Sequence, residues 1–133
     1  MLLLRQTVPP LLAFLTLMVV CGCGGGIQTE PVTGVVTMDG KPLPGVRVIF
    51  SPAEGGRANS VGTTDSEGAY SLVYTRKNAG AITGRYKVLV SKTKMTDEGE
   101  KETLPRKYNQ ETTFEAEVTS TGSNKFDYHL ESE

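Results

Sequence analysis

The chain has 133 residues, of which 14 are Lys or Arg and 15 are Asp or Glu, so its formal net charge is −1. Because positive and negative charges balance and no cationic run stands out, the sequence offers no basic stripe for nucleic acid and no polybasic patch for a membrane surface. Both cysteines, Cys21 and Cys23, lie near the N-terminus, which excludes a disulfide framework in the rest of the chain. A domain of ~100 residues must therefore be held by its hydrophobic core alone.

Residues 1–22 have the order of a secretory signal peptide. Arg5 supplies a positive charge, an apolar run follows over residues 11–20, and small residues then lead into a cysteine. The run is about ten residues long, whereas a helix that spans a bilayer needs ~20. Pro9 and Pro10 also precede it directly. The pattern therefore favours a cleaved signal over a retained transmembrane helix.

The cysteine at the cleavage point resembles the lipobox of bacterial lipoproteins, in which the thiol is acylated and becomes the first residue of the mature chain. The peptidase of that family needs a small residue before the cysteine, which favours Cys23 after Gly22 over Cys21 after Val20. The resemblance implies export and lipid anchoring to a bacterial membrane through Cys23, facing the periplasm or the exterior. The alternatives are a plain cleaved signal, a retained helix, and a badly strained disulfide between the two cysteines.

Residues 23–30 are rich in glycine at their start and predict a short flexible tether. From residue 31 onward, apolar side chains recur with the period of two that is typical of half-buried strands. The predicted strands cover residues 32–38, 46–50, 60–64, 70–74, 84–90, 114–118 and 126–130. Short alternating strands separated by turns predict an all-β domain over residues 31–133, folded as an antiparallel sandwich or barrel.

Residues 92–109 form one long polar stretch between two predicted strands. No window of the chain has helical periodicity, and at most one helical turn is expected, over residues 96–101. A long loop in a compact domain is either functional or disordered, so Leu104, Lys107 and Tyr108 are candidates for a partner-binding loop. The alternative, which we favour, is a solvated loop pinned against the sheet edge by Leu104 and Tyr108.

Several segments resemble the carboxypeptidase-regulatory-like, or transthyretin-like, family. They are Val32-Thr33-Gly34-Val35-Val36-Thr37 with the turn that follows it, Val46-Arg47-Val48-Ile49-Phe50, the D-x-x-G-x-Y turn Asp65 to Tyr70, and the G-x-Y-x-V strand Gly84 to Val88. The resemblance covers nearly the whole mature chain and implies a seven-stranded antiparallel Greek-key β-sandwich. With the lipobox and the Leu104-Pro105-x-Lys107-Tyr108 segment, the chain resembles a group of short bacterial lipoproteins.

The five residues that stand out in these motifs have structural roles that need no ligand. The Asp65 carboxylate can accept hydrogen bonds within its own turn, and Gly68 can adopt a positive φ there. Tyr70 and Tyr86 can bury their rings while each hydroxyl finds a partner. Gly84 opens the strand that carries Tyr86.

Catalytic and metal chemistry find little support in the sequence. The one histidine, His129, shares a strand face with Asp127 and Glu131, but residues two apart on a strand are separated by ~6–7 Å and do not converge on an ion. The hydroxyisourate hydrolases, an enzymatic branch of the transthyretin-like fold, need several histidines and a tyrosine-containing C-terminal tail. This chain ends in His129-Leu130-Glu131-Ser132-Glu133.

We therefore expect a non-enzymatic, lipid-anchored envelope module without a metal or cofactor, which contacts proteins or contributes to envelope architecture. The main alternative is a module that binds carbohydrate or a cell-wall polymer on an aromatic platform. Without Trp in the chain, such a platform would have to use Tyr74 and Tyr108. A hydrolase of the transthyretin-like fold is a remote third possibility. An envelope protein or a polysaccharide is the expected partner, and nucleic acid is not.

Overall fold

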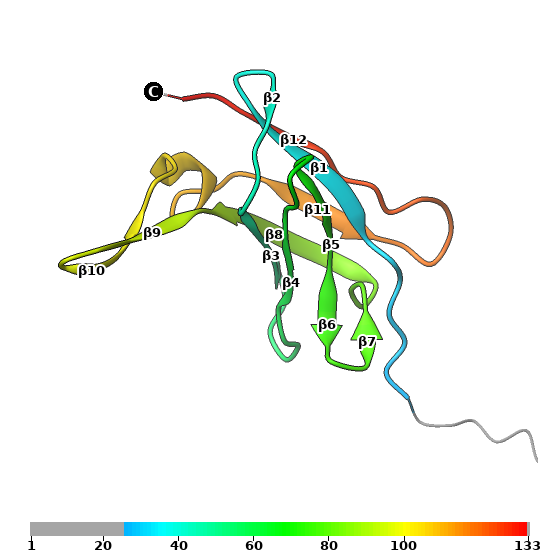
Figure 1. The fold of residues 1–133 in the computed structure, drawn as a ribbon. Coiled ribbons are helices and arrows are strands. Elements are labelled where there is room, and N and C mark those ends of the chain that lie inside the picture. Colours follow the sequence, from blue (N-terminus) through cyan, green and yellow to red (C-terminus); the bar gives the residue numbers. More distant parts are fainter. Residues whose placement is uncertain (1–25, 133) are drawn as a thin grey trace, which may run out of the picture.

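The structure is a computed structural model that describes residues 26–132. It is an all-β domain (Figure 1), and its only helical element in that range is one turn of 3-10 helix. The elements are β1 Thr33–Met38, β2 Lys41–Pro42, β3 Arg47–Pro52, β4 Ser60–Thr63, β5 Ala69–Ser71, β6 Val73–Thr75, β7 Asn78–Ala79, β8 Gly84–Ser91, β9 Thr93–Thr96, β10 Gly99–Glu102, η1 Arg106–Tyr108, β11 Glu115–Val118 and β12 Tyr128–Leu130. Within the described range, no helix has the length and apolarity to cross a bilayer.

Two sheets form the body of the domain. The larger has six strands in the order β11-β8-β3-β4-β6-β7, and the smaller has the order β12-β1-β2, with β5 also paired to β1. All strand pairs are antiparallel except β1 and β12, which run parallel with Val36 beside Tyr128 and Met38 beside Leu130. The prediction of an entirely antiparallel fold is therefore wrong at this pair. A parallel pair needs a long connection, and nearly the whole domain lies between these two strands.

The predicted strand at residues 70–74 is two strands in different sheets. β5 pairs with β1, whereas β6 pairs with β4, and the chain passes between the sheets at Leu72. There the N–H of Leu72 donates to the carbonyl of Val32, and its own carbonyl accepts from the N–H of Gly80. These hydrogen bonds take the place of regular strand pairing, so the N–H and the carbonyl of the buried Leu72 both have partners at the crossing.

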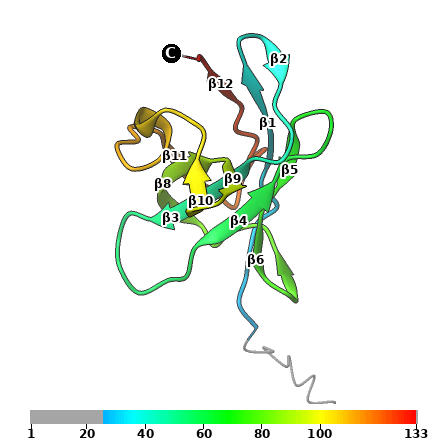
Figure 2. The ribbon, with the colours of Figure 1, turned by 60° about the vertical axis from the view of Figure 1, so that its left-hand side comes forward.

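The long polar stretch forms a β-hairpin, β9–β10, followed by η1. The expected helical turn over residues 96–101 is wrong, because this segment is the turn and second strand of the hairpin. Gly99 has a φ of 108°, which a helix does not contain, and the hydroxyl of Thr96 donates to its carbonyl across the turn at 2.8 Å. The hairpin projects from the body, and Figure 2 brings it forward with the two sheets behind it.

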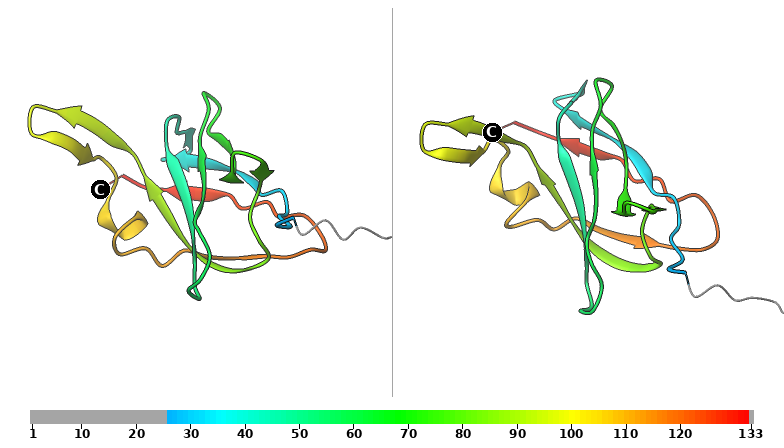
Figure 3. Two further views of the ribbon diagram at one scale, coloured as in Figure 1. Left: turned by 90° about the horizontal axis from the view of Figure 1, so that it is seen from below. Right: turned by 60° about the horizontal axis from the view of Figure 1, so that its bottom comes forward.

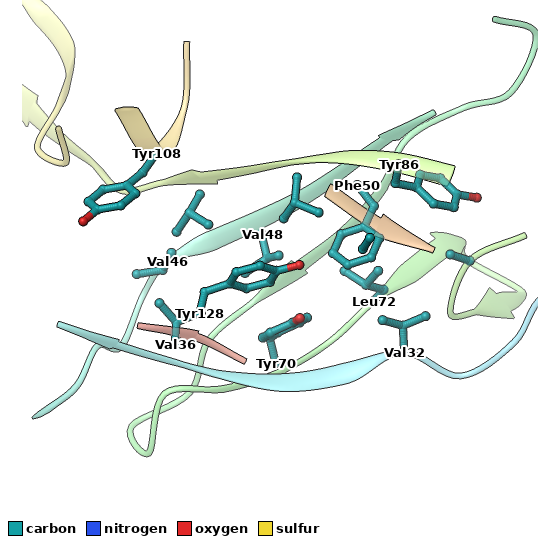
Figure 4. Packing of buried hydrophobic residues seen from close by; sticks show 14 of the residues in the cluster. Val32, Val36, Val46, Val48, Phe50, Tyr70, Leu72, Tyr86, Tyr108 and Tyr128 are labelled. Atoms are coloured by element: carbon teal, nitrogen blue, oxygen red, sulfur yellow. The ribbon is translucent and has the colours of Figure 1, made fainter. Parts of the chain in front are cut away.

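The core lies between the two sheets (Figure 4), where one side is buried in each of β1, β3, β4, β5, β8, β11 and β12. The larger sheet contributes Val48, Phe50, Tyr86, Val88, Val90, Ala116 and Val118, and the smaller contributes Val36, Tyr70, Tyr128 and Leu130. Phe50 links the layers, since its ring centroid lies 5.6 Å from that of Tyr86 and 5.7 Å from that of Phe126. Each fully buried side chain of this size stabilises the fold by about 1.5–3 kcal/mol.

Burial raises the pKa of both Tyr70 and Tyr128 well above the usual range. The two hydroxyls differ in their hydrogen bonding. Tyr70 donates to the carbonyl of Phe126 at 2.6 Å, whereas the Tyr128 hydroxyl has no hydrogen-bond partner within residues 26–132. We expect Tyr70→Phe to lower the free energy of unfolding by ~1–3 kcal/mol, because it leaves the partly buried carbonyl of Phe126 without this donor. Tyr128→Phe should leave it unchanged or raise it. Urea denaturation of both variants checks this, and equal losses would contradict it.

Candidate functional site

The turn around Asp65 is closed by the carboxylate of that residue. Its Oδ1 accepts hydrogen bonds from the N–H groups of Glu67 at 2.8 Å and Ala69 at 3.0 Å. The N–H of Gly68 donates to the Asp65 carbonyl, and Gly68 has a φ of 75°. Since one oxygen of the carboxylate serves the turn itself, the role of Asp65 here is structural.

Gly84 and Tyr86 lie at a contact with Arg57 that the sequence did not indicate. The guanidinium Nη1 of Arg57 donates to the carbonyl of Thr83 at 2.6 Å, and a Cβ placed on Gly84 would lie 2.7 Å from the same nitrogen. Gly84 therefore makes room for the guanidinium. The hydroxyl of Tyr86 donates to the carbonyl of Ile82, and burial raises the pKa of Tyr86 despite the opposing effect of Arg57.

An open groove of about 520 Å³ runs along the outer side of β8 and β11. Four charged side chains line it in two cross-strand pairs, Lys87 with Glu115 and Arg85 with Glu117. The remaining lining residues are Ala53, Tyr86 and Ala116. Because each cation faces an acid across the strands, the groove is polar but close to neutral, and it favours no charged ligand.

The candidate partner loop is anchored by two buried side chains. Leu104 and Tyr108 are each 7% exposed and belong to the core cluster. The ring of Tyr108 stacks on that of Phe114 with centroids 5.8 Å apart, and the N–H of Glu131 donates to its hydroxyl at 2.8 Å. Lys107 is exposed, with its Nζ 5.1 Å from the centroid of the Tyr108 ring. A buried Tyr108 cannot form an exposed sugar platform with Tyr74.

His129 lies on the exposed face of β12, and its surroundings do not converge on a site. Its ring Nδ1 lies 2.8 Å from the hydroxyl of Thr37, while Asp127 accepts a hydrogen bond from the N–H of Val35. Each of these side chains thus bonds to a different residue of β1. Among residues 26–132, no group of three or more His, Cys, Asp or Glu is placed to hold a metal ion.

Comparisons with known proteins add no family assignment, since neither a protein-family model nor a curated protein matches the chain. Among solved structures, the chain is similar to a 9R-lipoxygenase from Cyanothece PCC8801, with 13% sequence identity and a TM-score of 0.38. The similarity covers 77% of this chain and 16% of the lipoxygenase. A likeness this distant carries no argument about fold or activity.

Proposed function

We propose that the chain is an exported lipoprotein of the bacterial envelope, held to a membrane by an acylated Cys23, and that it acts by contact rather than by catalysis. The observation that carries this proposal is an order along the chain: a lipobox-like cysteine, a short exposed linker, and then a folded domain. Cys23 and the signal segment lie outside the described residues, so their support comes from the sequence.

The position at which the chain first packs against the domain supports a lipid anchor on Cys23. Gly26, Ile27 and Gln28 are exposed, and the first bonds to the domain come from Thr29, whose hydroxyl donates to the Ala79 carbonyl at 2.6 Å. Glu30 then pairs with Ala81. The fold thus starts a few residues after Cys23, so a lipid on that cysteine would not disturb the core. Mature lipoproteins carry two or three acyl chains, enough for stable anchoring.

The strand arrangement supports a Greek-key sandwich of the carboxypeptidase-regulatory-like kind. Two sheets face each other across one core, and the chain passes between them at Leu72. The strands nearest the two ends of the domain, β1 and β12, lie side by side. We propose that the seven predicted segments form the body of this sandwich, with residues 70–74 supplying β5 to one sheet and β6 to the other, and that β2, β7 and the β9–β10 hairpin are additions to it.

The hydrogen bonds made by the side chains of the family-like motifs favour a protein that acts by contact with a partner rather than by catalysis. The polar groups of Asp65, Tyr70 and Tyr86 bond to main-chain atoms of their own domain. Groups engaged in this way hold the fold and are not free to act as acid, base or nucleophile in a cleft.

The anchor is tested by exchanging each cysteine for serine in the native host. We expect Cys23→Ser to release a folded protein into the soluble fraction, because the thiol lies outside the core, and to abolish labelling with an alkyne analogue of palmitate. Cys21→Ser is the matched control and should remain labelled and bound to the membrane. Retention of the Cys23→Ser protein on membranes after alkaline carbonate washing would overturn the assignment.

A further inference from the structure

The β9–β10 hairpin is an arm held out from the domain. Its two strands pair only with each other, and their side chains are largely exposed on both faces. Isolated two-stranded hairpins are marginally stable in water, so this one depends on its attachment to the body. It also lies at the end of the domain opposite the point where residues 26–30 enter (Figures 1 and 3).

The base of the hairpin is fixed by the carboxylate of Glu102. One oxygen accepts from the N–H groups of Lys92 at 2.9 Å and Leu104 at 3.1 Å, and the other accepts from the hydroxyl of Ser91. The N–H and hydroxyl of Thr103 both donate to the Lys92 carbonyl. These bonds hold the arm in one direction relative to β8, so its two faces are presented consistently.

The two faces of the arm carry opposite charges. Lys94 lies directly opposite Lys101, so both side chains project from one face, while Met95 opposite Glu100 and Thr93 opposite Glu102 occupy the other. Like charges directly opposite each other on paired strands destabilise the pairing. Both lysines are exposed, and the one ion pair within residues 26–132 joins Arg106 to Glu111 instead. The lysine pair therefore costs stability, and neither lysine forms an ion pair within residues 26–132.

We propose that the lysine face of the hairpin, Lys94 and Lys101, binds a linear polymer that carries repeated phosphate groups. Cβ atoms of directly opposed residues are about 4.5–5.5 Å apart, so two flexible ammonium groups can approach one phosphate together and relieve their repulsion. A flat, exposed face suits an extended chain better than a small molecule, which needs a concave site.

The identity of the partner follows from the position of the arm and deepens the proposed function, on which this step rests. If Cys23 holds the chain to a membrane, the hairpin points away from that membrane, which favours an envelope polymer over lipid headgroups. Met95, 79% exposed, lies on the face of Glu100 rather than with the lysines. An element that lies in a bilayer interface has an apolar face opposite its basic face, whereas the face opposite the lysines here carries Glu100 and Glu102 beside Met95.

The test is binding of fluorescently labelled long-chain inorganic polyphosphate to the full-length protein in an uncharged detergent. We expect Lys94→Gln/Lys101→Gln to weaken binding about tenfold and to reduce its salt dependence. The matched control, Lys41→Gln/Lys77→Gln, removes the same charge from exposed sites elsewhere and should bind as the wild type does. Thermal unfolding separates binding from structure: the Lys94/Lys101 variant should be at least as stable as the wild type, since it loses a like-charge pair.

Several results would overturn the proposal. These are no binding of polyphosphate by the wild type, equal losses in the two double variants, or weaker binding accompanied by a lower unfolding temperature. Equal binding of poly-glutamate would indicate an acidic protein partner instead, and stronger capture by phosphatidylglycerol vesicles would indicate a membrane. The Cys23→Ser protein should bind polyphosphate normally, so failure of the lipid anchor and failure of the lysine face are distinguishable.

Discussion

Replacing Gly34 by alanine is expected to destabilise the domain by about 3 kcal/mol, a large fraction of the stability of a domain of this size. Gly34 occupies an inward position of β1, where a Cβ would lie 1.8 Å from the carbonyl oxygen of Phe126 and 2.8 Å from the ring of Tyr70. That carbonyl is also the acceptor for the Tyr70 hydroxyl. The added methyl group must therefore displace a backbone segment and a buried hydrogen bond together.

Chemical denaturation of the Gly34→Ala protein measures this effect. Gly55→Ala is the matched control, because Gly55 lies in an exposed loop and a Cβ there would meet no atom within 4 Å. The control should change the free energy of unfolding by less than ~0.5 kcal/mol. A loss at Gly34 no greater than that of the control would show that the chain segment at Phe126 does not press against β1.

Gly68→Val is expected to cost about 3 kcal/mol, from two separate causes. The φ of 75° forces a β-branched residue into the left-handed region, which costs ~1–2 kcal/mol. A Cβ would also lie 2.5 Å from the carbonyl oxygen of Val36, which accepts the N–H of Leu43, so the turn must move. Steric overlap of this kind adds about 1–3 kcal/mol.

A valine substitution at Gly40 separates the backbone strain from the steric overlap. Its φ is 81°, close to that of Gly68, but a Cβ there would meet no atom within 4 Å. Gly40→Val should therefore cost only the backbone strain, and the difference between the two variants in urea denaturation measures the contact with Val36. Equal losses would mean that the turn at Gly68 relaxes without cost.

Much of the buried core could be predicted from the sequence, because strand alternation is a local property. In segments 46–50, 84–90 and 114–118, one side of the strand is buried, as the alternating pattern predicted; Val48, Phe50, Val88 and Val90 are all fully buried. The turn at Asp65 and Gly68 was also readable, since a short side chain that bonds its own backbone and a glycine with positive φ act within a few residues. An all-β fold followed from these local signals.

Only part of the candidate contact surface could be predicted from the sequence. The sequence placed a possible partner loop over residues 92–109 and named Leu104, Lys107 and Tyr108, but two of these three side chains are buried. The lysine face depends on the pairing of Lys94 with Lys101, and the register of that hairpin is set by the turn at Gly99. A one-residue change of register would place the same lysines on opposite faces.

The sequence by itself determined which residues face inward along segments 46–50, 84–90 and 114–118, where the main turns lie, and that a cysteine follows an apolar leader. Only the tertiary structure decided that β1 runs parallel to β12, that the chain changes sheets at Leu72, and that Gly34 and Gly84 make room for Phe126 and Arg57. The reason is physical: alternation and turn chemistry act between near neighbours in the chain. Strand pairing and close contacts at glycines depend on residues far apart in sequence, which meet only when the two sheets pack on one core.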